Sequence, residues 1–156
     1  ERLPARSYEG DTPGESAKRL ADAGADIVGV NCLNGPKQQL PIAVEMVDAV
    51  AGAVPVASQP VGYATTDDSA DFTSWPDFPY GLTPKTLARA ELAAFAAEAR
   101  DAGVRYIGSC CGSVAEHVRA MAKMIGKLPA EEREWKSPTG EAMSAYEYYA
   151  HTETEV

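Results

Sequence analysis

Hydrophobic positions along the chain follow two patterns, one typical of helices and one typical of buried strands. Short runs of consecutive apolar residues, as expected of parallel strands covered on both faces, alternate with longer amphipathic or alanine-rich segments. This pattern predicts helices over residues 13–24, 37–51, 83–102 and 113–126, and strands over residues 26–32, 54–63 and 104–109. The alternation indicates an α/β protein with a parallel sheet and right-handed crossovers, built either as an open sheet or as a barrel.

Local sequence features mark the ends of these elements. Residues 12–15 (Thr-Pro-Gly-Glu) are typical of a capping box with proline at the first helical position, and residues 113–116 (Ser-Val-Ala-Glu) predict a second capping box. Residues 83–84 (Thr-Pro) predict the start of the third helix. Pro55 and Pro60 lack the N–H group that an interior strand position needs, so we place them at the two ends of the second strand.

Residues 64–82 form a predicted loop that is longer than an ordinary connection. A loop of this length within a compact domain is usually functional or disordered. Its aromatic residues, spaced among prolines, favour a packed lid over disorder; they are Phe72, Trp75, Phe78 and Tyr80.

Composition adds mainly exclusions. The 156 residues carry a net charge of −9, with 45% hydrophobic and 24% charged residues, which is typical of a soluble globular protein. No basic stripe is present to neutralise phosphates, so nucleic acid is not an expected partner. No apolar run approaches the roughly 18 residues needed to span a bilayer, and the first residues lack the apolar core of a signal peptide. We therefore expect a cytoplasmic protein with no membrane partner.

The three cysteines are the candidate functional residues. Cys32 ends the first predicted strand, while Cys110 and Cys111 directly follow the third; Gln59 lies near the end of the second. In parallel α/β folds, functional residues gather at the carboxyl ends of the strands, which places these side chains at one edge of the sheet.

Zinc is a metal that three such cysteines could bind. Three thiolates leave the fourth tetrahedral position open, as in a catalytic rather than a structural zinc site. Adjacent cysteines within a regular strand point to opposite faces, so Cys110 and Cys111 can share one ion only where the strand has ended. The flanking Gly108 and Gly112 permit the irregular backbone that this requires.

Other roles for the cysteines stay open on the residues alone. A buried cysteine commonly packs as a small hydrophobic residue, and an exposed thiol of low pKa can act as a redox sensor. Three cysteines cannot all pair in disulfides, and in a reducing compartment such residues are more often ligands or catalysts. No Ser-His-Asp set is evident, and we interpret His117 and His151 as surface or packing residues.

Specific motifs add a family resemblance. Residues 29–32 (Gly-Val-Asn-Cys), followed far downstream by residues 108–112 (Gly-Ser-Cys-Cys-Gly), resemble the zinc-dependent homocysteine S-methyltransferase family. Residues 58–60, 76–82 and 104–108 resemble the betaine–homocysteine branch of that family more narrowly. The resemblance covers about residues 10–128, and Ser109 stands where the family usually has a second glycine.

The resemblance implies a site and a reaction. Cys32, Cys110 and Cys111 would be the ligands of a Zn²⁺ ion, with Asn31 and Gln59 lining the substrate pocket beside it. The implied reaction transfers a methyl group from betaine to the thiol of homocysteine, giving methionine and dimethylglycine. The alternatives are a sulfonium donor such as S-methylmethionine, a non-catalytic zinc- or redox-responsive α/β fragment, or an inert fragment. Candidates for holding a cationic donor are Tyr63, Trp75, Phe78 and Tyr80.

The resemblance also implies a domain organisation. The family fold is a (β/α)8 TIM barrel, and the predicted elements match its last three βα units. We therefore expect a truncated barrel, with residues 1–128 as a partial homocysteine-binding domain and residues 129–156 as a short C-terminal tail. The expected partners are homocysteine and a methyl donor, together with a second copy of the chain or a complementing N-terminal half.

Overall fold

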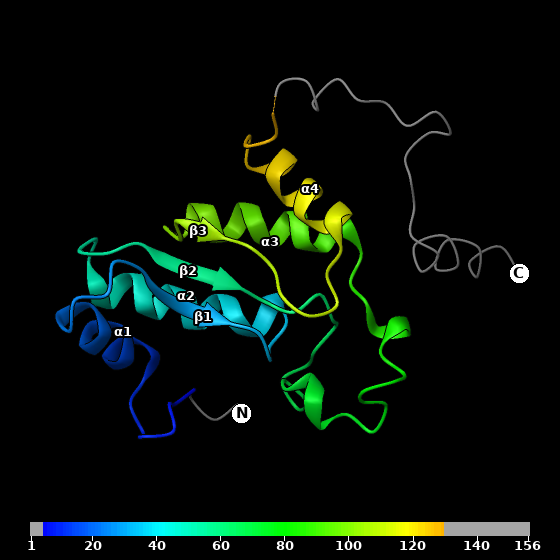
Figure 1. The fold of residues 1–156 in the computed structure, drawn as a ribbon, viewed down its shortest axis with the longest axis horizontal. Helices are drawn as coiled ribbons and strands as arrows, with labels where there is room; N and C mark the ends of the chain where they lie inside the picture. Colours follow the sequence, from blue (N-terminus) through cyan, green and yellow to red (C-terminus); the bar gives the residue numbers. More distant parts are fainter. Residues whose placement is uncertain (1–4, 130–156) are drawn as a thin grey trace, which may run out of the picture.

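The computed structural model describes residues 5–129, in which helices and strands alternate as the sequence pattern predicts. The predicted tail, apart from its first residue, lies outside this range. The elements run in the order α1 (Pro13–Asp22), β1 (Val28–Asn31), α2 (Pro36–Val50), β2 (Val56–Gln59), α3 (Arg89–Asp101), β3 (Tyr106–Ile107) and α4 (Ala115–Met124), as Figure 1 shows. No helix within residues 5–129 is long and apolar enough to cross a membrane.

The three strands form one open parallel sheet in the order β1-β2-β3. In the register, Val28 lies opposite Val56, and Asn31 lies opposite Gln59. The prolines on either side of β2 lie outside the strand, as predicted. The α/β class and the parallel sheet are therefore confirmed.

One face of the sheet is covered by helices. Val28 and Val56 pack with residues of α1 and α2, including Ala17, Met46 and Val50. A second cluster joins α2, α3 and α4 around Leu92, Phe95, Ala96, Ala99, Val104 and Met121.

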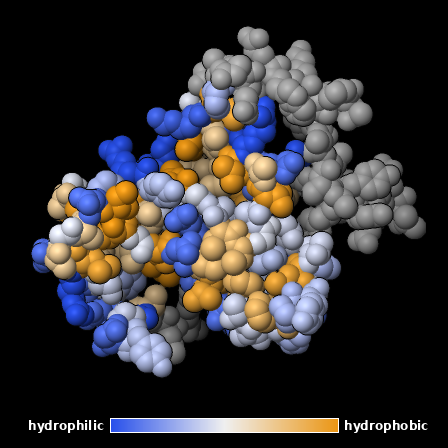
Figure 2. All heavy atoms as spheres, in the orientation of Figure 1, coloured by the Kyte–Doolittle hydropathy of each residue, from blue (hydrophilic) through white to orange (hydrophobic). Residues whose placement is uncertain are grey.

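The other face of the sheet is open over the described residues. Side chains alternate across a strand, so the residues next to Val28 and Val56 point away from the helices. Ile27 is 50% exposed and Tyr106 is 53% exposed, which is unusual for residues in or beside a parallel strand. In the orientation of Figure 1, Figure 2 shows hydrophobic residues reaching the surface in several places among polar ones. This open face carries the two polar residues predicted to line a pocket, Asn31 and Gln59.

The predicted start of the third helix at residues 83–84 is wrong. Thr83–Lys85 forms a single 3-10 turn, and α3 begins only at Arg89. The chain between them is held in an extended form by tertiary contacts: Thr86 forms a β-bridge with Tyr63, and the Leu87 N–H donates to the Gly62 carbonyl. Because these backbone groups are bonded elsewhere, they cannot take part in a helix.

The two predicted capping boxes have different outcomes. At α1, the Thr12 hydroxyl accepts from the Glu15 N–H, and a Glu15 carboxylate oxygen accepts from the Thr12 N–H, as predicted. At α4, the prediction of Ser113 as the cap is wrong by one residue. Val114 is the capping position, and its N–H donates to Nδ1 of His117 at 3.0 Å, so a histidine takes the place that glutamate usually fills.

The long loop is packed, in agreement with the prediction. Val61, Phe72, Trp75 and Leu82 are buried together in a third hydrophobic cluster. Phe72–Ser74 forms a short 3-10 helix, and the ring of Phe72 lies 5.1 Å from that of Tyr63. Cys32 and Cys110 pack against this cluster, so the loop forms one wall of the region around the cysteines.

Candidate metal centre

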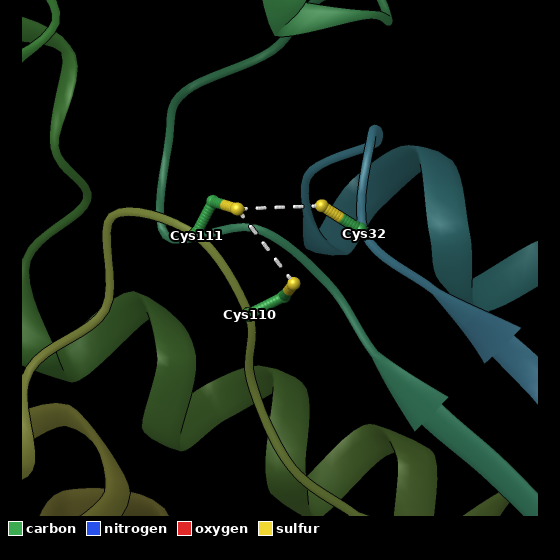
Figure 3. A group of neighbouring side chains, drawn as sticks. All are labelled: Cys32, Cys110 and Cys111. Carbon is green, nitrogen blue, oxygen red and sulfur yellow. Dashed lines mark hydrogen bonds between the residues drawn. The ribbon is translucent and has the colours of Figure 1, made fainter.

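The three cysteines converge on one point beyond the ends of β1 and β3. Their Sγ atoms all lie within 4.8 Å of one another. Cys32 comes from the turn after β1, while Cys110 and Cys111 come from the irregular segment after β3, and the sulfur atoms point toward each other in Figure 3. None of the three is in a disulfide.

Main-chain hydrogen bonds to the end of β2 and the segment that follows it place both ligand-bearing turns. The Cys32 N–H donates to the Gln59 carbonyl at 2.9 Å, and the Cys110 N–H donates to the Pro60 carbonyl at 2.8 Å. The Gly62 N–H in turn donates to the Cys111 carbonyl at 2.8 Å. Because β3 ends at Ile107, the adjacent cysteines escape the alternation of a strand and can both face Cys32.

The glycines beside the cysteine pair have different functions. Gly112 has φ of 79°, and a Cβ there would lie 2.5 Å from the Tyr63 ring, so both its backbone conformation and its packing exclude a side chain. Gly108 instead leaves space for Gln59, whose Cγ would lie 3.2 Å from an added Cβ. Ser109 keeps an ordinary negative φ, and its hydroxyl donates to the Pro60 carbonyl at 3.0 Å.

The thiols in this cluster differ in acidity. Burial raises the pKa of Cys32, but hydrogen bonds from Cys110, the Leu33 backbone and Cys111 outweigh it, so the pKa of Cys32 is lowered overall. The hydrogen bond to Cys32 is the largest cause that raises the pKa of Cys111 to about 11, followed by burial and by the neighbouring thiols. In the metal-free protein, Cys32 is therefore more acidic than Cys111, which keeps its proton at neutral pH.

The donor set and its spacing suit zinc. Three thiolates are soft ligands, and Zn²⁺ binds thiolate sulfur at about 2.3 Å, so two sulfurs on one tetrahedral ion lie about 3.8 Å apart. The Cys32 and Cys111 sulfurs are 3.5 Å apart, and the Cys110 and Cys111 sulfurs are 3.8 Å apart. The cysteines could therefore hold such an ion with only small side-chain movements.

The other predicted site residues lie beside this cluster. Asn31 and Gln59 are register partners at the ends of β1 and β2, on the open face of the sheet. Asn31 is exposed and Gln59 is half-buried. Asn31 directly precedes Cys32 in the chain, and the Gln59 carbonyl accepts from the Cys32 N–H. Both residues therefore adjoin the turn that carries Cys32.

The aromatic candidates divide into packed and exposed residues. Trp75 is buried, and the Lys85 ammonium lies 4.5 Å from its ring centroid, so a cation of the protein itself already occupies that face. Tyr63 packs edge-on against Trp75; burial raises the pKa of Tyr63, with a further contribution from Cys111. Phe78 is 43% exposed and Tyr80 is 96% exposed. The four residues thus form part of the loop core and its rim rather than a closed cage.

Sequence reasoning missed two buried polar residues next to the cluster. Gln39 and Ser58 are both fully buried and hydrogen-bond to each other, and Gln39 also donates to the turn that carries Cys32. The helical pattern could have identified Gln39, because it lies on the same stripe of α2 as Ala43, Met46 and Val50, where an apolar residue is expected.

His117 is a packing residue, which agrees with one of the two interpretations made from the sequence. It is 4% exposed, and its Nδ1 accepts from the Val114 N–H. Nε2 therefore carries the proton and donates to the Leu87 carbonyl at 2.9 Å. His151 lies outside the described residues.

Fold and site together define an α/β protein with a cluster of three thiols at the carboxyl edge of a parallel sheet. Residues 3–125 match the homocysteine S-methyltransferase family. The chain is 39% identical to betaine–homocysteine S-methyltransferase 1 of Mus musculus over 142 residues, which are 88% of this chain and 34% of the mouse protein. It is 44% identical to the Danio rerio protein of the same name over 126 residues, which are 78% of this chain and 32% of that protein.

A third relative differs in its named methyl donor. The chain is 40% identical to S-methylmethionine–homocysteine S-methyltransferase of Pongo abelii over 143 residues, which are 86% of this chain and 38% of that protein. The chain belongs to the homocysteine S-methyltransferase family. It spans about a third of the length of these relatives.

Proposed function

We propose that this chain supplies the zinc-binding part of a homocysteine S-methyltransferase, with Cys32, Cys110 and Cys111 as the metal ligands. The observation that carries the proposal is the convergence of the three sulfurs within 4.8 Å, at spacings that suit one tetrahedral zinc ion. Family membership supports the same reaction class. In this proposal, residues 1–128 are a partial TIM-barrel homocysteine-binding domain, and residues 129–156 are a separate tail.

The proposed chemistry follows from the donor set. A zinc ion held by the three thiolates would leave one tetrahedral position open for a substrate thiol and would favour its deprotonation, with the proton released to solvent. The homocysteine sulfur attacks the methyl carbon of a positively charged donor: the new S–CH₃ bond forms as the donor's own bond to that methyl breaks. The departing atom keeps the electron pair and becomes neutral. With betaine as the donor, the products are methionine and dimethylglycine.

Asn31 and Gln59 are proposed to line the substrate pocket. Their side chains lie on the open face of the sheet, next to the Cys32 turn, where a molecule bound through its sulfur would extend. Gly108 supports this role for Gln59, because the absent Cβ leaves space for the glutamine side chain beside the cysteine pair.

Betaine is the proposed donor, and S-methylmethionine is the second candidate. Residues 76–82, within the loop beside the cysteines, resemble the betaine enzymes. The second candidate has support because the chain is 40% identical to a relative named for S-methylmethionine and 39% identical to one named for betaine. Either donor carries a positive charge, and the exposed Tyr80 and part-exposed Phe78 are the aromatic faces of that loop open to it.

Methyl transfer is proposed to require more polypeptide than residues 5–129. The face of the sheet that carries Asn31 and Gln59 also exposes Ile27 and Tyr106, so it offers an apolar surface to further strands. We propose that a complementing N-terminal half supplies those strands. The alternative is that a second copy of the chain contributes to the site. The cytoplasm stays our expected compartment, because free thiols persist there.

Zinc X-ray absorption with and without substrate tests this function. The zinc-loaded chain is expected to show three sulfur neighbours, and addition of L-homocysteine is expected to add a fourth. L-homoserine, which has a hydroxyl in place of the thiol, should leave the spectrum unchanged. Bound zinc that does not respond to homocysteine would instead support a non-catalytic zinc module. Robust methyl transfer by the chain alone would contradict the need for further polypeptide.

A further inference from the structure

A buried glutamine amide connects the Cys32 turn to the neighbouring strand. Gln39 lies near the start of α2 and has no exposed surface. Its Nε2 donates to the Cys32 carbonyl at 3.1 Å, and its Oε1 accepts from the Ser58 hydroxyl at 3.0 Å. Ser58 lies in β2 and is also fully buried.

The hydrogen-bond partners fix the orientation of this amide. A backbone carbonyl can only accept, so the nitrogen of the Gln39 amide must face Cys32. Its oxygen then faces Ser58, whose hydroxyl must donate. Reversing the amide would place two acceptors against each other at Cys32, so the Cys32 carbonyl sets the orientation, and the Ser58 hydroxyl anchors the amide oxygen on the other side.

The turn at Cys32 has a backbone that needs such support. Cys32 has φ of 66° and Leu33 has φ of 61°, so two consecutive residues with side chains are in the left-handed region. That region is disfavoured for residues with a Cβ, and it persists only where the surroundings determine it. Here the Cys32 N–H is bonded to Gln59, while its carbonyl accepts from Gln39 and from the Asn34 N–H at 2.7 Å.

The direction of the Cys32 sulfur depends on this turn. With both peptide groups of Cys32 held, its Cβ is directed toward the pair after β3, and its sulfur lies 3.5 Å from that of Cys111. Cys32 is the only one of the three that comes from the β1 side of the sheet, so no adjacent cysteine can compensate for a rotation there.

We propose that Gln39 is a positioning residue for the Cys32 ligand, anchored by Ser58. This inference rests on the proposed zinc site, and it adds residues that do not touch the metal. Loss of the amide leaves the Cys32 carbonyl without its side-chain donor and allows the left-handed turn to relax, which moves the sulfur away from its partners. Substitution of a residue that hydrogen-bonds to a metal ligand without touching the metal typically lowers metal affinity by about 10- to 100-fold.

The neighbouring Gln38 provides a matched control. It is also a buried glutamine of α2, with 5% exposure. Its side chain bonds to Thr65 and Asp67 of the long loop. Gln38→Met and Gln39→Met therefore remove the same amide from adjacent positions of one helix, and the second removes the hydrogen bond to the Cys32 carbonyl.

Cobalt and zinc titrations of the reduced 156-residue chain test the proposal. For Gln39→Met, zinc affinity measured by chelator competition should fall by about 10- to 100-fold relative to Gln38→Met. The cobalt complex of Gln39→Met should also have a weaker thiolate-to-cobalt charge-transfer band, since Cys32 is the thiolate that is lost. A purely structural role in α2 would lower thermal stability without changing that band.

The outcomes separate this inference from the proposed function. If the unmodified chain binds no metal at the cysteines, both proposals fail. If it binds metal and the two glutamine variants do so equally well or equally poorly, only the assignment of Gln39 is overturned. Should Gln39→Met not fold, Ser58→Ala decides instead. A several-fold loss of affinity with a weakened band supports the anchor, and an unchanged affinity overturns it.

Discussion

The sulfur atoms of Cys32 and Cys111 lie 3.5 Å apart, although 79 residues separate them in the chain. Two parallel strands and the segment after β2 bring them together, since each cysteine-bearing turn is hydrogen-bonded to the stretch from Gln59 to Gly62. The cluster is thus a product of the tertiary fold rather than of a short metal-binding loop, and its properties should depend on residues that fix these turns.

Zinc affinity is expected to rise with pH. Zinc-bound thiols are deprotonated, and the pKa of Cys111 near 11 means that this thiol keeps its proton at neutral pH until metal displaces it. Each proton released changes the affinity by about tenfold per pH unit. Because the pKa of Cys111 is raised, its proton competes with zinc over the whole range below that value, so affinity should fall as the pH falls.

Chelator competition between about pH 6 and pH 8.5 measures this dependence. The slope should correspond to the release of at least one proton, which calorimetry in buffers of different ionisation enthalpy can count directly. Zinc affinity that is constant across this range would contradict binding by the three thiols.

Substitution of Gly112 should damage both stability and the metal centre. At φ of 79°, an alanine is strained by about 1–2 kcal/mol, and its Cβ would also lie 2.5 Å from the Tyr63 ring. Gly52→Ala is the matched control, since Gly52 has φ of 82° but nothing within 4 Å of an added Cβ.

Urea unfolding and zinc titration of the two glycine variants provide the comparison. Gly112→Ala should lower the free energy of unfolding by about 1–3 kcal/mol more than Gly52→Ala, because of the additional clash. It should also weaken zinc binding through the displaced Cys111, whereas Gly52→Ala should leave zinc affinity unchanged. Equal effects of both substitutions on zinc would argue against a tight fit between Gly112 and Tyr63.

The aromatic loop residues should separate into structural and surface positions. Trp75 is 8% exposed and its indole N–H donates to the Ser69 carbonyl, so Trp75→Ala should lower the free energy of unfolding by about 3–5 kcal/mol. Tyr80 is 96% exposed, and Tyr80→Ala should change the free energy of unfolding by less than about 0.5 kcal/mol. Thermal or urea unfolding measures both, and similar losses for the two variants would contradict a packed loop.

The sequence predicts the cysteine cluster because strand ends are visible as the last residue of an apolar run. It also predicts the cap at Thr12, where both partners lie within one turn. The start of α3 and the cap of α4 are predicted wrongly because they depend on distant or unusual partners. Tyr63 and Gly62 hold the chain before α3 extended, and His117 replaces a glutamate at the cap.

The supporting residues behind the cluster are harder to predict for the same reason. A glutamine within an apolar stripe indicates that its amide has hydrogen-bond partners in the core, but it does not identify those partners. Only the tertiary structure shows that the Gln39 amide meets the Cys32 carbonyl on one side and Ser58 on the other. The left-handed backbone at Cys32 and Leu33 is likewise hard to predict from the sequence, because neither residue is a glycine.

Zinc content of the purified, reduced chain tests the central claim most directly. Metal analysis should find one zinc per chain. Replacement of any one of Cys32, Cys110 and Cys111 by serine should weaken zinc binding by more than about 100-fold. The loss should exceed the roughly 10- to 100-fold that is typical for residues that only hydrogen-bond to a metal ligand. Ser113→Ala, which alters a hydroxyl near the pair without removing a thiol, should retain the metal. A chain without zinc, whose three thiols all titrate freely with a thiol reagent, would contradict the account.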